Sequence, residues 1–359
     1  MLYVYLTEGC NLACRHCWIQ PAGQGAAPAG QCLPLETLEF ILDQAVPLGL
    51  QAVKLTGGEP LLHPEILGIL QRLGRRGLTC VLETNGTLIT SAIVAQLAKA
   101  PHTQVTVSLD GADAATHERF RRVPGCYAAT LAGIEALASA GLRPQIIMTL
   151  LRGNEEQLEA VVRLAESLGA GSVKFNVLQP VGRGKELLAA GQGLLIEELL
   201  SLARWVEQDL AERTGLPLFF HHPLAFQPLS RLFADRSLGC GQCGILGILG
   251  VLADGSYALC GIGRHVPELV FGDAAAGSLR DVWEGHPRLA ELRQGLPSRL
   301  QGICGNCLMK HMCLGGCLAY NYEAHGSFWG PFWYCHQAWE AGRFPASRLA
   351  LRKAAREFG

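Results

Sequence analysis

The sequence has little charge and few aromatic side chains. Only 17% of its 359 residues are charged, 7% are aromatic, and the formal net charge is −1. Such a balance excludes the basic footprint by which proteins hold nucleic acids, and it excludes a polybasic membrane anchor. We therefore expect neither nucleic acid nor a membrane among the partners of this protein.

Long hydrophobic runs are also missing. The closest candidate, from Ile245 to Ala253, is interrupted by Gly247 and Gly250 and falls short of the roughly 20 apolar residues of a membrane span. Met1 leads directly into a strand-like segment without a charged region or a cleavage-site pattern, so we expect no secretory signal. These absences predict a cytoplasmic protein. Because 49% of the residues are hydrophobic, the chain can bury enough surface to exclude intrinsic disorder.

Cysteine, by contrast, is abundant, with 14 residues in the chain. Clustered cysteines in a reducing compartment indicate metal binding or catalysis more often than disulfides. One group lies near the N-terminus and a second lies between residues 240 and 335. Cys32, Cys80 and Cys126 fall outside both groups, and we interpret them as buried small hydrophobic side chains or loop thiols.

Short strand-like runs alternate with segments of helical periodicity in the first half of the chain. The pattern predicts strands at Leu2–Thr7, Ala52–Thr56, Thr79–Thr84, Val105–Leu109, Gln145–Leu150 and Val173–Leu178. It predicts helices at Leu35–Leu48, Glu65–Arg75, Ser91–Lys99, Tyr127–Ala140 and Glu155–Leu168. Six strands alternating with helices indicate an α/β fold with a parallel sheet, which we predict to be a partial (β/α)6 barrel. Ligands in such sheets bind at the carboxyl ends of the strands.

The pattern changes after Gln179. A helical stretch at Leu194–Thr214 is followed by a strand-like run and then by a glycine- and cysteine-rich region that bound metal would brace. Ala346–Phe358 has the pattern of a terminal helix. We therefore expect a barrel at residues 1–193, a bridging helical segment at 194–237, a largely irregular extension at 238–340 and a C-terminal helix at 341–359.

The N-terminal cysteines are Cys10, Cys14 and Cys17, with the spacing C-x3-C-x2-C in the loop after the first strand. Three thiolates within eight residues can converge on one iron–sulfur cluster. A zinc site would require a fourth ligand, which His16 or Cys32 could supply. The group of three favours iron, because it leaves one iron of a [4Fe–4S] cluster open to an exogenous ligand.

This triplet resembles the signature of radical S-adenosylmethionine (radical SAM) enzymes. Thr56–Pro60, after the second strand, is similar to the GGEP motif of that superfamily, and Gln179–Arg183 resembles a common element after the sixth strand. Thr84–Gly86 and Ser108–Gly111 are similar to segments that line its SAM pocket. The resemblance implies that Glu59 faces the SAM ammonium and that His16 lies beside the adenine. It implies a SAM pocket built from His16, Gly57, Gly58, Glu59, Pro60, Asn85, Ser108 and Asp110.

The C-terminal cysteines resemble the SPASM extension of radical SAM enzymes. Their spacing is Cys304-x2-Cys307-x5-Cys313-x3-Cys317-x17-Cys335, preceded by Cys240-x2-Cys243 and by Cys260. The resemblance implies two auxiliary [4Fe–4S] clusters, three clusters in all. One would be bound by Cys240, Cys243, Cys260 and Cys317, the other by Cys304, Cys307, Cys313 and Cys335. Adjacency alone would instead group Cys317 with its upstream neighbours, and an isolated C-x2-C pair can also bind zinc.

The resemblance also implies the reaction. One electron, from a donor such as flavodoxin or ferredoxin, would cleave SAM to a 5′-deoxyadenosyl radical that abstracts hydrogen from a substrate. SPASM proteins mostly modify peptides, so we expect a ribosomally made peptide or a protein side chain as the substrate. The alternatives are a radical SAM enzyme that acts on a small molecule or a carbohydrate, and a sulfatase-maturase-like enzyme. A non-catalytic iron–sulfur electron-transfer protein is a further hypothesis. Gly261 counts against the sulfatase-maturing branch, which has an acidic residue after the cysteine that matches Cys260. We assign no catalytic base.

Overall fold

The computed structural model of the chain describes residues 1–21, 23, 24, 30–100, 102–229 and 243–350. The chain divides into two compact units. The first contains residues 1–221 and 245–290, and the second contains residues 222–244 and 291–359.

The first unit is built on a ten-stranded sheet with the order β12-β11-β10-β1-β4-β5-β6-β7-β8-β9. The strands of its parallel part are β1 (Leu2–Thr7), β4 (Ala52–Gly57), β5 (Thr79–Thr84), β6 (Gln104–Ser108), β7 (Gln145–Leu150), β8 (Ser172–Val177) and β9 (Leu218–His221). Because β12 and β9 are separate edges, the sheet is not closed. The predicted partial α/β barrel is confirmed.

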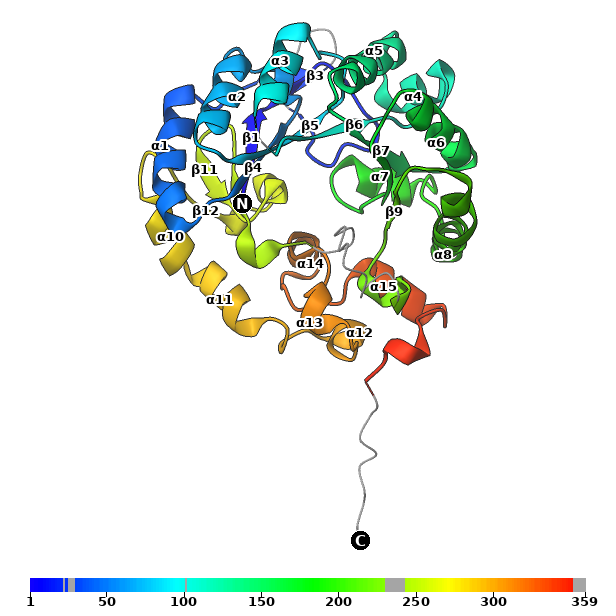
Figure 1. Ribbon diagram of the computed structural model, residues 1–359. Helices are drawn as coiled ribbons and strands as arrows, with labels where there is room; N and C mark the ends of the chain where they lie inside the picture. The colour runs from blue at the N-terminus through cyan, green and yellow to red at the C-terminus, as the bar shows by residue number, and fades with distance from the viewer. Residues whose placement is uncertain (22, 25–29, 101, 230–242, 351–359) are drawn as a thin grey trace. The chain divides into compact units, whose positions relative to one another are not determined.

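Helices cover this sheet on one side (Figure 1), where α1, α2, α3, α5, α6 and α8 lie outside the strands. The apolar stripe of each helix packs inward; α2, for example, buries Ile66, Ile69, Leu70 and Leu73. The helices of the barrel are α1 (Leu35–Ala45), α2 (Ile66–Arg75), α3 (Ser91–Lys99), α4 (Ala114–Arg121), α5 (Cys126–Ser139), α6 (Leu158–Ser167), α7 (Arg183–Ala189) and α8 (Ile196–Trp205).

Two of these helices, α4 and α7, were not predicted. The reason is clearest for α4, whose buried residues are Thr116, His117, Phe120 and Arg121. Three of these four side chains are polar, so the helix shows no apolar periodicity in the sequence.

A short β-meander extends the sheet beyond β1. The strand β10 (Leu249–Val251) pairs in parallel with β1, while β11 (Ser256–Ala258) and β12 (Val270–Asp273) follow in antiparallel pairs. These strands and α10 (Leu279–Gly285) belong to the same compact unit as the barrel. They lie within the expected region 238–340. The division into the four expected segments stays a prediction.

The second unit consists of short helices around an aromatic core. The helices are α12 (Gly302–Gly305), α13 (Lys310–Cys313), α14 (Leu318–His325) and α15 (Trp333–Glu340), and α11 (Pro287–Gly295) leads into them. Phe226 lies 5.2 Å from Tyr334 and 5.6 Å from Phe344, measured between ring centroids. Edge-to-face contacts of this kind stabilise a core that buries several aromatic side chains.

The expected C-terminal helix is wrong where the structure describes it. Ala346–Arg348 form a single 3-10 turn, and Leu349 then pairs with Cys307 in an isolated β-bridge. The buried Arg348 side chain donates hydrogen bonds to the carbonyl oxygens of Ala225 and Gln227. These contacts favour an extended exit from the turn. Residues 351–358 lie outside the described residues.

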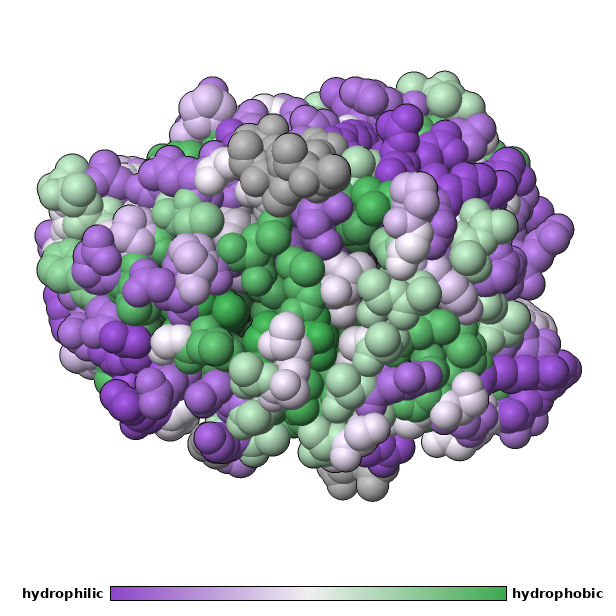
Figure 2. Space-filling view, turned by 90° about the horizontal axis from the view of Figure 1, so that it is seen from above, coloured by the Kyte–Doolittle hydropathy of each residue, from purple (hydrophilic) through white to green (hydrophobic). Residues whose placement is uncertain are grey.

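The surface combines polar and apolar residues. Figure 2 shows hydrophobic residues beside hydrophilic ones on one face of the molecule, as the low fraction of charged residues predicts. In the described ranges, no helix has both the length and the apolar character that crossing a bilayer requires.

The close contact between α5 and the loop after β5 can be tested by substitution of a glycine. A Cβ atom on Gly133 of α5 would lie 2.1 Å from the carbonyl oxygen of Gly86, in the loop after β5. We expect Gly133→Ala to lower the free energy of unfolding by about 1–3 kcal/mol, although alanine favours helices. The control is Gly74→Ala in α2, where the nearest atom would be 3.5 Å away. That change should raise stability by about 0.5–1 kcal/mol. Chemical denaturation measures both, and equal effects would contradict the packing argument.

Candidate cofactor site

The loops that follow β1 and β4 are joined by backbone hydrogen bonds. The Gly58 amide donates to the carbonyl oxygen of Thr7 at 2.8 Å, and the Glu59 amide donates to that of Gly9 at 2.9 Å. The buried Thr7 hydroxyl lies 3.0 Å from the Glu59 carbonyl oxygen and donates to it. The cysteine loop and the Gly-Gly-Glu-Pro turn therefore form one hydrogen-bonded unit.

The two glycines of this turn are required by the approach of the cysteine loop. A Cβ atom on Gly58 would lie 1.9 Å from the carbonyl oxygen of Gly9. Gly57 has a φ of +130°, and a Cβ atom there would lie 2.7 Å from the carbonyl oxygen of Thr7. A side chain at either position would separate the two loops.

The three N-terminal cysteines share one small buried cluster. Cys10 and Cys14 are buried with Leu12 and Cys126, and the half-buried Cys17 packs against them. Burial raises the pKa of Cys10 to about 12, and it also raises the pKa of Cys14. Neutral thiols are therefore favoured until a metal displaces their protons.

Three cysteine thiols in one buried group are a donor set that suits a [4Fe–4S] cluster. Among the described residues, no three histidine, cysteine or acidic side chains are already placed around one ion. A four-iron cluster offers a separate iron to each thiolate, so its ligands need not meet at one point.

The cysteines outside the two groups differ in their surroundings. Cys80 and Cys126 are buried, while Cys32 is half-buried. Cys126 contacts the cysteine loop, a position that its place in the sequence did not indicate. Burial raises the pKa of Cys126 to about 11, so this thiol is neutral at physiological pH.

Glu59 ties the end of β4 to the end of β5. Its carboxylate accepts hydrogen bonds from the Leu61 amide at 3.1 Å, the Thr84 hydroxyl at 2.7 Å and the Asn85 amide at 2.9 Å. The side chain is buried, and burial raises the pKa of Glu59 to about 7 against the effect of these donors. The residue therefore has a structural role in addition to the expected contact with an ammonium.

Asn85 connects the same region to the cysteine loop. Its side-chain amide donates to Asn11 Oδ1 at 2.8 Å, and its own oxygen accepts from the Thr87 amide at 2.9 Å. The Asn11 amide in turn donates to the Thr87 hydroxyl at 2.8 Å. Pro60 is buried at the start of the 3-10 turn Pro60–Leu62, and Ser108 is half-buried at the end of β6.

Asp110 is fully buried beneath the cysteine loop. Its carboxylate lies 2.7 Å from Arg121 Nε and 3.4 Å from His16 Nε2, and it accepts a hydrogen bond from the Thr149 amide at 3.0 Å. Burial disfavours the charged form, but the Arg121 guanidinium holds the pKa of Asp110 below its usual value. Burial lowers the pKa of His16 to about 4, so its imidazole is neutral. The structure thus brings Asp110 and His16 together.

Comparison with known proteins finds one matching family and several related proteins. Residues 4–165 match the Radical SAM superfamily. The AdoMet-dependent heme synthase of Methanosarcina barkeri is 33% identical over 345 residues, which are 92% of this chain and 94% of that protein. The chain belongs to the radical SAM superfamily. A second relative, the mycofactocin maturase MftC of Mycobacterium ulcerans, is 29% identical over 97% of this chain and 90% of its own.

Solved structures of radical SAM enzymes share the fold. SuiB of Streptococcus suis bound to its precursor peptide SuiA has a TM-score of 0.75 at 19% identity, covering 93% of this chain and 75% of SuiB. The enzyme anSMEcpe with bound AdoMet and a peptide has a TM-score of 0.70 at 20% identity, covering 96% of both chains. The likeness to these structures shows that the fold is shared. The predicted radical SAM enzyme is confirmed by the family match and by the relatives.

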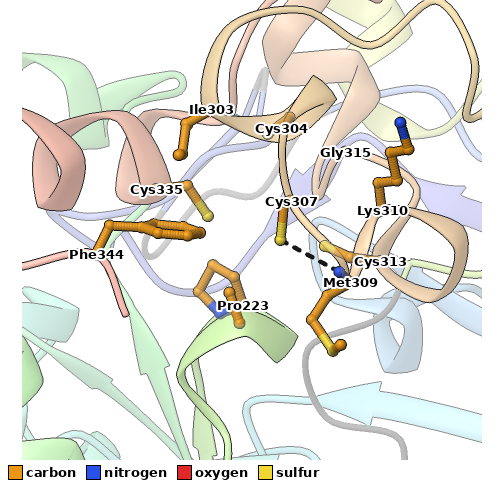
Figure 3. Close-up of a pocket in the computed structure, with 11 residues that line it drawn as sticks. Pro223, Ile303, Cys304, Cys307, Met309, Lys310, Cys313, Gly315, Cys335 and Phe344 are labelled. Carbon is orange, nitrogen blue, oxygen red and sulfur yellow. Dashed lines mark hydrogen bonds between the residues drawn. The ribbon is translucent and has the colours of Figure 1, made fainter. Parts of the chain in front are cut away.

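The extension of this radical SAM enzyme brings four cysteines to one pocket. Cys304, Cys307, Cys313 and Cys335 line it together with Pro223, Met309, Lys310 and Phe344 (Figure 3). Cys304 Sγ accepts a hydrogen bond from the Phe332 amide at 3.4 Å, and Cys307 Sγ accepts one from the Met309 amide at 3.3 Å. Backbone donors aimed at sulfur suit thiolate ligands.

The structure describes three of the four cysteines that are expected to bind the other auxiliary cluster. Cys317 directly precedes α14 and is half-buried. Cys243 lies in the same compact unit, whereas Cys260 follows β11 in the barrel unit. Cys240 lies outside the described residues. The grouping of these four cysteines stays a prediction.

Tyr5 of β1 occupies the place where a side chain at position 261 would project. The Gly261 amide donates to the Tyr5 hydroxyl at 2.7 Å, and a Cβ atom on Gly261 would lie 2.3 Å from the Tyr5 ring. An acidic side chain after Cys260 therefore does not fit beside Tyr5.

We expect Glu59→Gln to weaken AdoMet binding roughly ten- to a hundredfold, because a charge-assisted hydrogen bond is worth about 1.5–3 kcal/mol. The glutamine can still accept from the Leu61 amide and the Thr84 hydroxyl, so the variant should fold. Glu59→Ala should additionally lower the unfolding free energy by about 1–3 kcal/mol for each buried hydrogen-bond donor that loses its acceptor. Calorimetric titration with AdoMet and thermal denaturation separate the two effects. Unchanged affinity in folded Glu59→Gln would leave Glu59 with the structural role alone.

The contact between Tyr5 and Gly261 can be tested by stability. Gly261→Ala should cost about 1–3 kcal/mol, since the added carbon overlaps a buried ring. The control is Gly277→Ala, where nothing lies within 4 Å of the added carbon. In the double variant Tyr5→Ala/Gly261→Ala the costs should not add, because the first change creates space for the second. Strict additivity of the two unfolding free energies would refute the contact.

Proposed function

We propose that the cysteine loop binds a [4Fe–4S] cluster through Cys10, Cys14 and Cys17, and that AdoMet binds between this loop and the ends of β4, β5 and β6. The observation that supports this most strongly is the hydrogen-bonded joining of the loops by Thr7, Glu59 and Asn85. A site assembled in this way is preorganised before any cofactor enters it.

When bound, the reduced cluster and AdoMet supply a 5′-deoxyadenosyl radical that abstracts a hydrogen atom from the substrate. The residues of the chain hold and orient these groups. Glu59 would face the ammonium of AdoMet through the lone pairs that its three protein donors leave free. His16, which lies beside Asp110, would be placed against the adenine. The buried surroundings of Cys10 and Cys14 would exclude water from the cluster.

The extension is proposed to hold two auxiliary [4Fe–4S] clusters. Cys304, Cys307, Cys313 and Cys335 would bind one, which their common pocket supports. Cys240, Cys243, Cys260 and Cys317 would bind the other. We further propose that the protein acts in the cytoplasm with flavodoxin or ferredoxin as the electron donor, because free thiols and reduced clusters persist in a reducing compartment.

Metal content tests the cofactor assignment. Anaerobically reconstituted protein should contain about twelve irons per chain if three four-iron clusters are present. Replacing Cys10, Cys14 and Cys17 together by alanine should remove about four irons and abolish reductive cleavage of AdoMet, measured as 5′-deoxyadenosine. Stoichiometric zinc with little iron in protein produced under iron-replete, anaerobic conditions would contradict the assignment.

For the substrate we propose a peptide or protein side chain. The support is the similarity to mycofactocin maturase MftC, which extends over nearly the whole of both chains. The second candidate is a heme-type macrocycle. It is favoured by the 33% identity to AdoMet-dependent heme synthase and by the 27% identity, over 97% of this chain, to pre-heme d1 synthase of Dinoroseobacter shibae.

Isotope transfer distinguishes the two substrates. The reconstituted enzyme is incubated with AdoMet, a reductant and either a deuterated peptide or a deuterated iron porphyrin. The proposal predicts that deuterium enters 5′-deoxyadenosine with the peptide and not with the porphyrin. Transfer from the porphyrin alone would replace the first candidate by the second.

A further inference from the structure

A buried guanidinium lies against the cysteine loop. Arg121 is the last residue of α4, and it is 7% exposed. Its Nη1 donates to Cys14 Sγ at 3.5 Å. The sequence motifs gave no indication of this residue, because it lies in a helix without apolar periodicity.

Asp110 provides the counter-charge that makes this burial possible. The Arg121 Nε atom lies 2.7 Å from Asp110 Oδ2, and both side chains are almost completely excluded from solvent. An unpaired buried guanidinium would be strongly unfavourable, whereas a paired one can be retained for its electrostatic effect. Arg121 is thus the positive end of a fixed dipole that faces Cys14.

The side chain of Arg121 is not needed to attach α4 to the loop. The backbone already does so: the Ala13 amide donates to the Arg121 carbonyl oxygen at 3.1 Å, and the Arg15 amide donates to that of Phe120 at 2.9 Å. These bonds do not involve the side chain at position 121. The guanidinium therefore contributes charge and a donor to sulfur, beyond holding the loop.

We propose that Arg121, held by Asp110, is a positioning residue that raises the electron affinity of the N-terminal cluster. This inference rests on the proposed function, since it requires a cluster on Cys14. Reduction adds a negative charge to the cluster, and a nearby cation favours the reduced form. Hydrogen bonds to ligand sulfur act in the same direction. In the low dielectric of the buried site, this interaction is poorly screened.

The test is a redox titration of the anaerobically reconstituted full chain, monitored by electron paramagnetic resonance. The signal of the N-terminal cluster is identified as the one missing from the Cys10/Cys14/Cys17 alanine variant. Arg121→Gln should disfavour reduction of this cluster at least tenfold, which corresponds to about 59 mV for one electron. Arg121→Lys keeps the charge and should shift the potential less. Arg119→Gln is the matched control, because Arg119 is exposed on the same helix.

The possible outcomes distinguish failure of the role proposed for Arg121 from failure of the proposed function. An unchanged midpoint potential in Arg121→Gln with a full cluster would overturn the role of Arg121 and leave the proposed function intact. Loss of the cluster from both Arg121 variants would assign the residue to cluster assembly and likewise overturn the electrostatic role. Absence of any such signal from the unmodified protein would instead contradict the proposed function.

Discussion

The close approach of two loops is the constraint on which the rest of the site depends. The backbone after β1 and the backbone after β4 meet at Gly57 and Gly58, where no side chain fits. This contact places Glu59 so that its carboxylate can accept from the end of β5. The ends of β1, β4 and β5 are therefore joined before any cofactor is present. Because these loops are already ordered, cofactor binding costs less conformational entropy.

A second layer of polar residues lies beneath the cysteine loop. Asp110 at the end of β6 and Arg121 at the end of α4 form an ion pair in the interior, and the Arg183 guanidinium donates to the Cys14 carbonyl oxygen at 2.7 Å. The loop is thus supported by side chains from two further parts of the barrel. Such support distinguishes a binding loop of defined geometry from a flexible surface turn.

Much of the barrel could be predicted from the sequence, because its strands and most of its helices follow hydrophobic periodicity. β1, β5, β7 and α3 begin and end at the predicted residues. The helix α4 escaped prediction because its buried face is polar, and the expected terminal helix gives way to a 3-10 turn where Arg348 binds two carbonyl oxygens. Local patterns do not report such long-range contacts.

The same limit applies to the site. The motifs located Glu59 and Asp110 at strand ends and indicated that both contact the ligand. The structure shows that three protein donors already bind the Glu59 carboxylate and that Arg121 pairs with Asp110. The roles of Arg121 and Tyr5 depend on partners more than 100 positions away in the chain. Spacing within a motif carries no information about such partners.

The most direct measurement is anomalous diffraction at the iron edge from crystals of the anaerobically reconstituted protein grown with AdoMet. We predict anomalous density for a four-iron cluster within bonding distance of the sulfur atoms of Cys10, Cys14 and Cys17. AdoMet should lie between this cluster and Glu59. Iron absent from these three sulfurs, or a zinc signal in its place, would contradict the account.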